Sequence, residues 1–105
     1  MDEYVHVLST TQKKEDAARI AKALVDRRLA GCVQILGPLE STYRWRGKVE
    51  RAREWLLLIK STRKAYPRLE KAIKEMHPYE TPEILALPVV KGSKEYLSWL
   101  SGEVR

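Results

Sequence analysis

The sequence has few of the features that mark exported, membrane or disulfide-rich proteins. It contains one cysteine, Cys32, which has no partner for a disulfide within the chain. No apolar run approaches the roughly 18 residues that a membrane-spanning helix needs. Residues 1–4 show no basic segment leading into an apolar one, so we expect no secretory signal. These absences favour a protein of the reducing cytoplasm with no membrane partner.

Motifs of the common enzyme and metal-site classes are also missing. The chain has no G-x-S-x-G, Walker or G-x-G-x-x-G loop, and no C-x-x-C, H-x-x-x-H or H-E-x-x-H spacing. One of its two histidines, His6, lies in the middle of an expected strand and is interpreted as a packed residue. Cys32 lies in an apolar run and is expected to be a buried thiol. The sequence therefore predicts a protein that is not an enzyme.

The charge of the chain is basic but evenly spread. Its 105 residues carry a net charge of +6, and 32% of them are charged. Basic and acidic residues are interspersed along the chain, which is typical of a mixed-charge surface. The length predicts one domain spanning 1–105. RNA-recognition domains use aromatic residues in a K/R-G-F/Y motif, but this chain has no phenylalanine, so we expect no nucleic-acid partner. Abundant charge and the absence of asparagine resemble the composition of thermostable proteins.

The spacing of apolar residues predicts an α+β domain. Helices are expected at 15–29 and 66–76, where apolar residues recur three and four positions apart. Ser9–Thr11 offers an N-cap for the first helix, and Gly31 follows its expected end. The order βαββαβ with an extra C-terminal helix is that of the ferredoxin-like fold. The expected strands are 4–8, 32–45 with an interruption at Gly37-Pro38, 49–60 and 82–90, and the final helix follows Ser93.

Proline and glycine predict the order of the strands in the sheet. Strands 4–8 and 49–60 contain neither residue and are expected at the centre. Strands 32–45 and 82–90 contain proline and are expected at the edges, or with a bulge. Arg46-Gly47 is predicted to form a tight hairpin turn with a positive φ at the glycine.

The third expected strand is apolar on both faces. Trp55, Leu57 and Ile59 point one way, and Leu56 and Leu58 point the other. The two main helices cover only one face of the sheet in this topology. The other face leaves roughly 300 Å² of apolar surface, which monomers seldom tolerate. The C-terminal helix is one candidate cover, but a second copy of the chain is favoured. We therefore expect a closed homo-oligomer, and the pattern leaves dimer and trimer open.

The segment 77–83, His-Pro-Tyr-Glu-Thr-Pro-Glu, combines a backbone stiffened by two prolines with polar side chains. An imidazole, a phenol and two carboxylates on a rigid loop suit a binding site. A plain connector, whose prolines end a helix and begin a strand, fits equally well. His77, Met76 and Cys32 are soft donors suited to copper, although their spacing alone favours structural roles.

Several segments together resemble the CutA family of divalent-cation tolerance proteins. The resemblance runs nearly end to end, and it is most specific in the combination of Y-x-W-x-G with H-P-Y-E-x-P-E. The segments that carry it are Ala30–Gln34, Tyr43–Val49, Glu54, Lys60–Thr62, His77–Glu83 and Tyr96–Leu100.

The resemblance implies a ferredoxin-like homotrimer, similar to the PII signalling proteins, which binds copper or other divalent cations, needs no obligatory cofactor and is not an enzyme. It makes His77 the first metal candidate and Cys32 the second. Ser9 and Met76 stand where some members have cysteine and histidine, which removes two soft ligands. The alternative is a PII-like regulatory trimer that binds a small anionic metabolite between subunits, motivated by Lys60 and the nearby arginine and tyrosine residues. The residues implied to line an inter-subunit cleft are Tyr43, Trp45, Glu54, Lys60, Tyr79 and Glu80.

Overall fold

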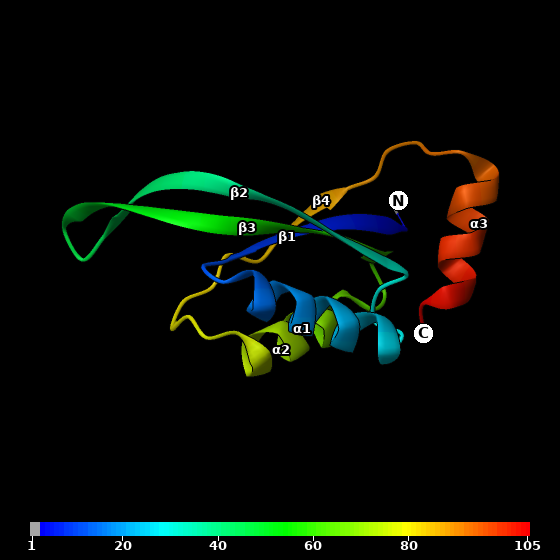
Figure 1. Ribbon diagram of the computed structural model, residues 1–105. Coiled ribbons are helices and arrows are strands. Elements are labelled where there is room, and N and C mark those ends of the chain that lie inside the picture. Colours follow the sequence, from blue (N-terminus) through cyan, green and yellow to red (C-terminus); the bar gives the residue numbers. More distant parts are fainter. Residues whose placement is uncertain (1–2) are drawn as a thin grey trace.

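The computed structural model describes residues 3–105, which form one four-stranded sheet and three helices (Figure 1). Met1 and Asp2 lie outside the described residues. They belong to the N-terminal segment in which we expect no secretory signal. No helix in residues 3–105 is long and apolar enough to cross a membrane. The elements are β1 (Tyr4–Thr11), α1 (Lys14–Asp26), β2 (Cys32–Trp45), β3 (Lys48–Thr62), α2 (Tyr66–Met76), β4 (Leu85–Pro88) and α3 (Lys94–Glu103).

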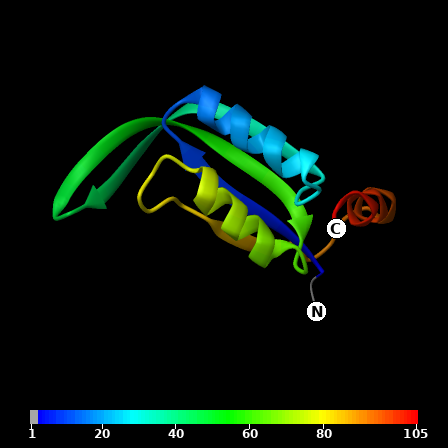
Figure 2. The ribbon, with the colours of Figure 1, turned by 90° about the horizontal axis from the view of Figure 1, so that it is seen from below.

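The sheet has the order β2-β3-β1-β4, and every neighbouring pair is antiparallel. The connection β1–α1–β2 skips one place in the sheet, which β3 fills; this is the split βαβ arrangement of ferredoxin-like folds. Figures 1 and 2 show α1 and α2 side by side on one face of the sheet. The predicted fold class is confirmed, as are the central positions of the first and third strands and the edge positions of the two strands that contain proline.

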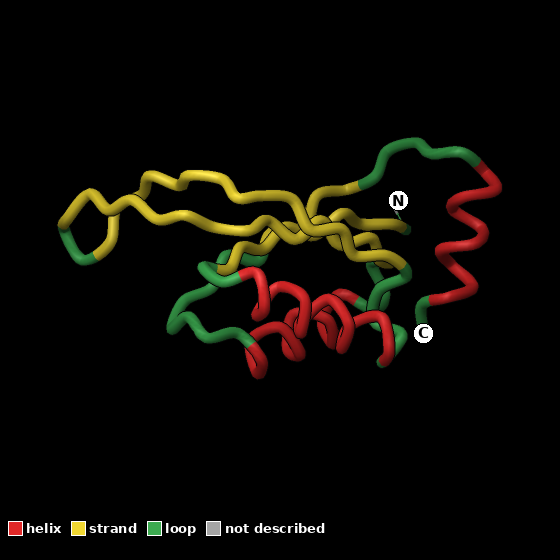
Figure 3. Tube along the Cα trace, in the orientation of Figure 1, coloured by secondary structure: helices red, strands yellow, loops and turns green. Residues whose placement is uncertain are grey.

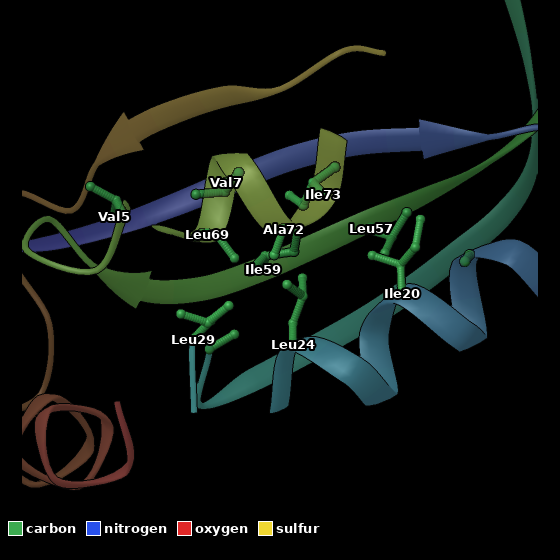
Figure 4. Close-up of a cluster of buried hydrophobic side chains, with 12 residues drawn as sticks. Val5, Val7, Ile20, Leu24, Leu29, Leu57, Ile59, Leu69, Ala72 and Ile73 are labelled. Carbon is green, nitrogen blue, oxygen red and sulfur yellow. The ribbon is translucent and has the colours of Figure 1, made fainter. Parts of the chain in front are cut away.

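The core lies between the helices and the two central strands (Figure 4). Alternate residues of the strands face the helices: Val5 and Val7 in β1, and Leu57 and Ile59 in β3. The helices meet them with the apolar stripes that their three- and four-residue spacing predicts. Burying each such aliphatic side chain contributes roughly 1.5–3 kcal/mol. The buried residues from the helices are Ala17, Ile20, Leu24, Leu69, Ala72 and Ile73.

The opposite face of the sheet is apolar and has no helix over it (Figure 1). Directly paired residues share a face, and the register places Leu36 beside Leu56, and Leu85 and Leu58 on either side of Leu8. Leu36 is 59% exposed and Leu85 is 56% exposed. Because α3 packs at the end of the sheet, it leaves these residues uncovered. The third strand is therefore apolar on both of its faces, as predicted.

Strands β2 and β3 form a hairpin that extends well beyond the helices (Figure 3). Arg46 and Gly47 make its turn with φ values of 51° and 80°, which fits a two-residue turn with both residues in the left-handed region. The predicted turn is confirmed. The predicted interruption at Gly37 and Pro38 is a bulge between Leu36 and Leu39, as expected for a strand that contains proline, and β2 continues beyond it to Trp45.

Helix α1 differs from its expected bounds at both ends. Ser9–Thr11 continues β1, because pairing with β3 places Ser9 opposite Leu57 and Thr11 opposite Trp55. The N-cap position falls to Lys13. At the other end the chain turns at Arg28, which has a φ of 60°, and the amide of Leu29 then donates to the carbonyl of Leu24.

Gly31 has a packing role and does not close α1. A Cβ atom at this position would lie 2.5 Å from Cδ1 of Leu100, a buried residue of α3. The glycine therefore lets α3 approach the start of β2. Helix α3 begins as predicted, since the Ser93 hydroxyl accepts a hydrogen bond from the Tyr96 amide at 3.1 Å.

The structure corrects two further expectations. Strand β4 covers only 85–88 and not 82–90, because pairing with β1 stops at Pro88 and at Leu85. Cys32 is only partly buried, since it lies on the edge strand β2 and on the open face of the sheet.

Candidate functional site

A pocket of about 630 Å³ lies where the β2–β3 hairpin meets the loop after α2. The hairpin supplies one wall through residues of β2 and Glu54 of β3, and the loop 77–83 supplies the other. Five of the six residues proposed for a cleft line this pocket. The lining residues are Thr10, Ser41, Thr42, Tyr43, Trp45, Glu54, Tyr79, Glu80, Thr81 and Glu83.

Glu54 and Tyr79 form the buried base of the pocket. The Tyr79 hydroxyl donates to Oε2 of Glu54 at 2.6 Å, and Glu54 is only 6% exposed. Burial raises the pKa of Tyr79, and the hydrogen bond to Glu54 and its charge raise it further. The phenol therefore stays protonated at neutral pH and acts as a fixed donor to the carboxylate.

His77 joins the end of α2 to β1 with both of its ring nitrogens. Nδ1 accepts a hydrogen bond from the Tyr79 amide at 3.1 Å, so Nε2 carries the proton that it shares with the Thr10 carbonyl at 2.8 Å. Burial lowers the pKa of His77, against the opposing effects of the Thr10 hydrogen bond and of the negative charges of Asp16 and Glu54. The imidazole is therefore neutral near pH 7, and it orients the loop that carries Tyr79.

The structure places Cys32 and Lys60 away from this pocket. Cys32 pairs with Lys60 across β2 and β3, and Lys60 pairs with His6 on its other side. The Lys60 ammonium donates to the Gln34 side chain. His77 is hydrogen-bonded to Thr10. Thr10 lies four positions along β1 from His6, which is about 13 Å at roughly 3.3 Å per residue.

Cys32 and His77 are therefore not brought together within one chain. Across residues 3–105, no three side chains of histidine, cysteine, aspartate or glutamate are grouped so as to hold a metal ion. The proposed cleft residues separate in the same way, because Tyr43, Trp45 and Glu54 lie at the pocket and Lys60 does not.

Sequence reasoning missed several residues of the site. Ser41 could have been found, since it shares the outward face of β2 with Tyr43 and Trp45 at two-residue spacing. Thr10 could not, because the extension of β1 was not anticipated. Arg46 was assigned only to the turn, yet its guanidinium donates to Oε1 of Glu80 at 2.8 Å, and its Cζ lies 5.3 Å from the centroid of the Trp45 ring.

Comparisons with known proteins agree along almost the whole chain. The family model described as "CutA1 divalent ion tolerance protein" matches residues 5–103. The divalent-cation tolerance protein CutA of Thermus thermophilus is 52% identical over 94 residues, which cover 90% of this chain and 91% of that protein. The corresponding protein of Pectobacterium atrosepticum is 42% identical over 101 residues, covering 96% and 92%.

Solved structures agree with the sequence comparisons. A divalent cation tolerance protein from Thermus thermophilus superposes with a TM-score of 0.95 at 48% identity, covering 97% of this chain and 99% of that one. CutA1 from Oryza sativa superposes with a TM-score of 0.95 at 36% identity, covering 99% and 95%. The sequence motifs, the fold and these matches lead to one conclusion: the chain belongs to the CutA1 family of divalent ion tolerance proteins.

Proposed function

We propose that this chain contributes to divalent-cation tolerance as a non-enzymatic homotrimer in the cytoplasm. Family membership supports the tolerance role, since the relatives above are named for it. That name describes tolerance and not a reaction, which favours a role in binding and assembly. The lone cysteine fits a reducing compartment. The observation that carries the assembly is the apolar sheet face that one chain leaves open.

The open face favours a second copy of the chain as its cover. It holds Leu36, Leu56, Leu58, Leu85 and Leu87, all on the side away from α1 and α2. Covering roughly 300 Å² of such surface contributes about 7 kcal/mol per chain. The hairpin extends beyond its own helices (Figure 3), and we expect it to contact a neighbouring copy.

Light scattering at micromolar concentration tests the assembly. We expect a particle of three 12.2-kDa chains that persists on dilution. A particle of one or two chains would overturn the trimer and with it the shared cleft.

For the metal ion we propose His77 as the first donor and Cys32 as the second. The neutral imidazole of His77 is the form that ligates metals, so no proton competes for it near pH 7. Its Nδ1 accepts a hydrogen bond from the Tyr79 amide at 3.1 Å, and an ion bound at this nitrogen would replace that bond. Because Cys32 and His77 lie apart in one chain, an ion held by both would take them from different copies.

Calorimetric titration with Cu²⁺ separates these donors. We expect His77→Ala to weaken binding by about tenfold or more, and Cys32→Ser to weaken it less. The matched control is His6→Ala, which removes the other histidine at a site away from the pocket. Equal affinity in wild type and His77→Ala would remove His77 from the site.

The pocket disfavours the PII-like alternative of an anionic metabolite. Among the residues that motivate that hypothesis, Lys60 lies outside the pocket and donates to Gln34. The charged residues that line the pocket are Glu54, Glu80 and Glu83, and their carboxylates repel an anion.

A further inference from the structure

The pocket is negatively charged in a protein that is positively charged overall. The chain carries a net charge of +6, yet each charged residue that lines the pocket, Glu54, Glu80 and Glu83, is a glutamate. A concave site lined by charges of one sign concentrates ions of the opposite sign. The site is therefore suited to a cation.

Aromatic side chains form the rest of the recognition surface. Tyr43 and Trp45 reach the pocket from the hairpin, and Tyr79 reaches it from the loop. In one chain Tyr43 and Trp45 are 44% and 40% exposed, and both rings line the pocket. An aromatic face attracts an ammonium or guanidinium group through its electron-rich π cloud. Rings and carboxylates together form the type of site that recognises organic cations.

The protein's own Arg46 already occupies part of this surface. Its guanidinium lies 5.3 Å from the Trp45 ring centroid and donates to Glu80 at 2.8 Å. Both partners of this ion pair are 70% exposed, so the pair is weak and opens readily. Arg46 therefore shows that this position accepts a cationic group, and its guanidinium would compete weakly with a ligand there.

A bare divalent ion fits this pocket less well than an organic cation. Hard divalent ions need several converging oxygen ligands, and no group of three acidic, histidine or cysteine side chains in residues 3–105 is placed to provide them. Oε2 of Glu54 already accepts from Tyr79. Aromatic rings contribute nothing to such an ion but favour an alkyl cation, whose stem packs against them.

We propose that the pocket binds a small organic cation that carries an ammonium or guanidinium group. The charged head takes the place of Arg46 between Trp45 and Glu80, and the aliphatic stem runs along Tyr43 toward Glu54. Every group involved belongs to one chain, and the inference does not depend on the metal role proposed above.

Calorimetry with agmatine tests this inference, since agmatine has a guanidinium at one end and an ammonium at the other. The full chain, freed of metal with EDTA, is titrated in its native assembly at constant ionic strength. We expect saturable binding that Trp45→Ala and Glu80→Gln each weaken by about tenfold. The matched controls keep wild-type affinity: Trp99→Ala, at a tryptophan of similar exposure on α3, and Glu75→Gln, on α2.

Removing the internal competitor gives the sharpest test. Arg46→Gln frees Trp45 and Glu80, so agmatine affinity should rise by roughly twofold to fivefold. Circular dichroism confirms that each variant is folded. Absence of saturable binding to wild type, unchanged affinity in both pocket variants, or weaker binding by Arg46→Gln would each overturn the inference. Equal competition by MgCl₂ at matched ionic strength would overturn it as well, because the site would then recognise charge alone.

Discussion

Tyr79 donates a 2.6 Å hydrogen bond to Glu54, a carboxylate that is almost fully buried between the hairpin and the loop after α2. The two residues are 25 positions apart in the sequence. Their contact fixes the loop to β3 and leaves the carboxylate with a donor in a site from which water is largely excluded. The bond is thus both a structural tie and the base of the pocket.

Tyr79→Phe should lower the free energy of unfolding by about 1–3 kcal/mol. The loss follows because the variant leaves the buried Glu54 oxygen without its donor. Urea unfolding at one fixed protein concentration measures it. Tyr43→Phe is the matched control, since this tyrosine is 44% exposed, and the stability of this variant should stay within about 0.5 kcal/mol of wild type. Equal stability of the two variants would contradict a structural role for the contact.

Stability should decrease as the pH falls below about 6.5. Burial holds the pKa of His77, and also that of His6, below the value of 6.5 that a histidine has in the unfolded chain. Between the two pKa values the unfolded chain binds more protons than the folded one, so acid favours unfolding. Each histidine contributes at most about 1.4 kcal/mol per pH unit in this window.

His77→Gln isolates the contribution of that residue to the pH dependence. The variant should be less stable at pH 7.5, because its backbone contacts are lost, yet its stability should fall less steeply toward about pH 5. Urea unfolding across this range gives both slopes. Parallel curves for wild type and variant would show that His77 titrates normally in the folded state.

A charge on the open sheet face should disrupt the assembly. Leu36→Lys places an ammonium among the exposed leucines, where burial by a second copy becomes unfavourable. Light scattering should report a smaller particle. Val25→Lys on α1, at a residue that is also exposed, should leave the mass unchanged. Loss of assembly in both variants would place the interface elsewhere.

Gly31→Ala should destabilise the protein by about 1–3 kcal/mol, because the added methyl group meets Leu100 at 2.5 Å. Gly102→Ala is its opposite, since a Cβ at Gly102 meets no atom within 4 Å and lies inside α3. That change should add roughly 0.5–1 kcal/mol of stability. Thermal unfolding of both variants measures these changes in stability. A stabilised Gly31→Ala variant would contradict the close packing of α3.

The sequence predicted those features that local chemistry controls. Proline kept β2 and β4 at the edges, and Arg46-Gly47 placed the hairpin turn. The amino-acid sequence could not predict features that arise from tertiary contacts. Ser9–Thr11 has the residues of a helix cap, but backbone pairing with β3 draws it into the sheet.

The candidate site was predictable only in part, for the same reason. Tyr43, Trp45, Glu54, Tyr79 and Glu80 line one pocket of the chain, whereas the resemblance implied a cleft between subunits. The hydrogen bonds within it join residues far apart in the chain, and no local pattern encodes them. The sharing of this pocket between subunits, and the place of Lys60 in it, stay predictions.

The length of the hairpin has a consequence for regulation. Tyr43 and Trp45 lie near the tip of the hairpin and line the pocket, so a partner that holds the hairpin also sets how widely the pocket opens. If a neighbouring copy holds the hairpin, ligand binding in the pocket and assembly of the oligomer are thermodynamically linked. Each must then strengthen or weaken the other by the same factor. Dilution would then alter ligand affinity without any change in the residues that touch the ligand.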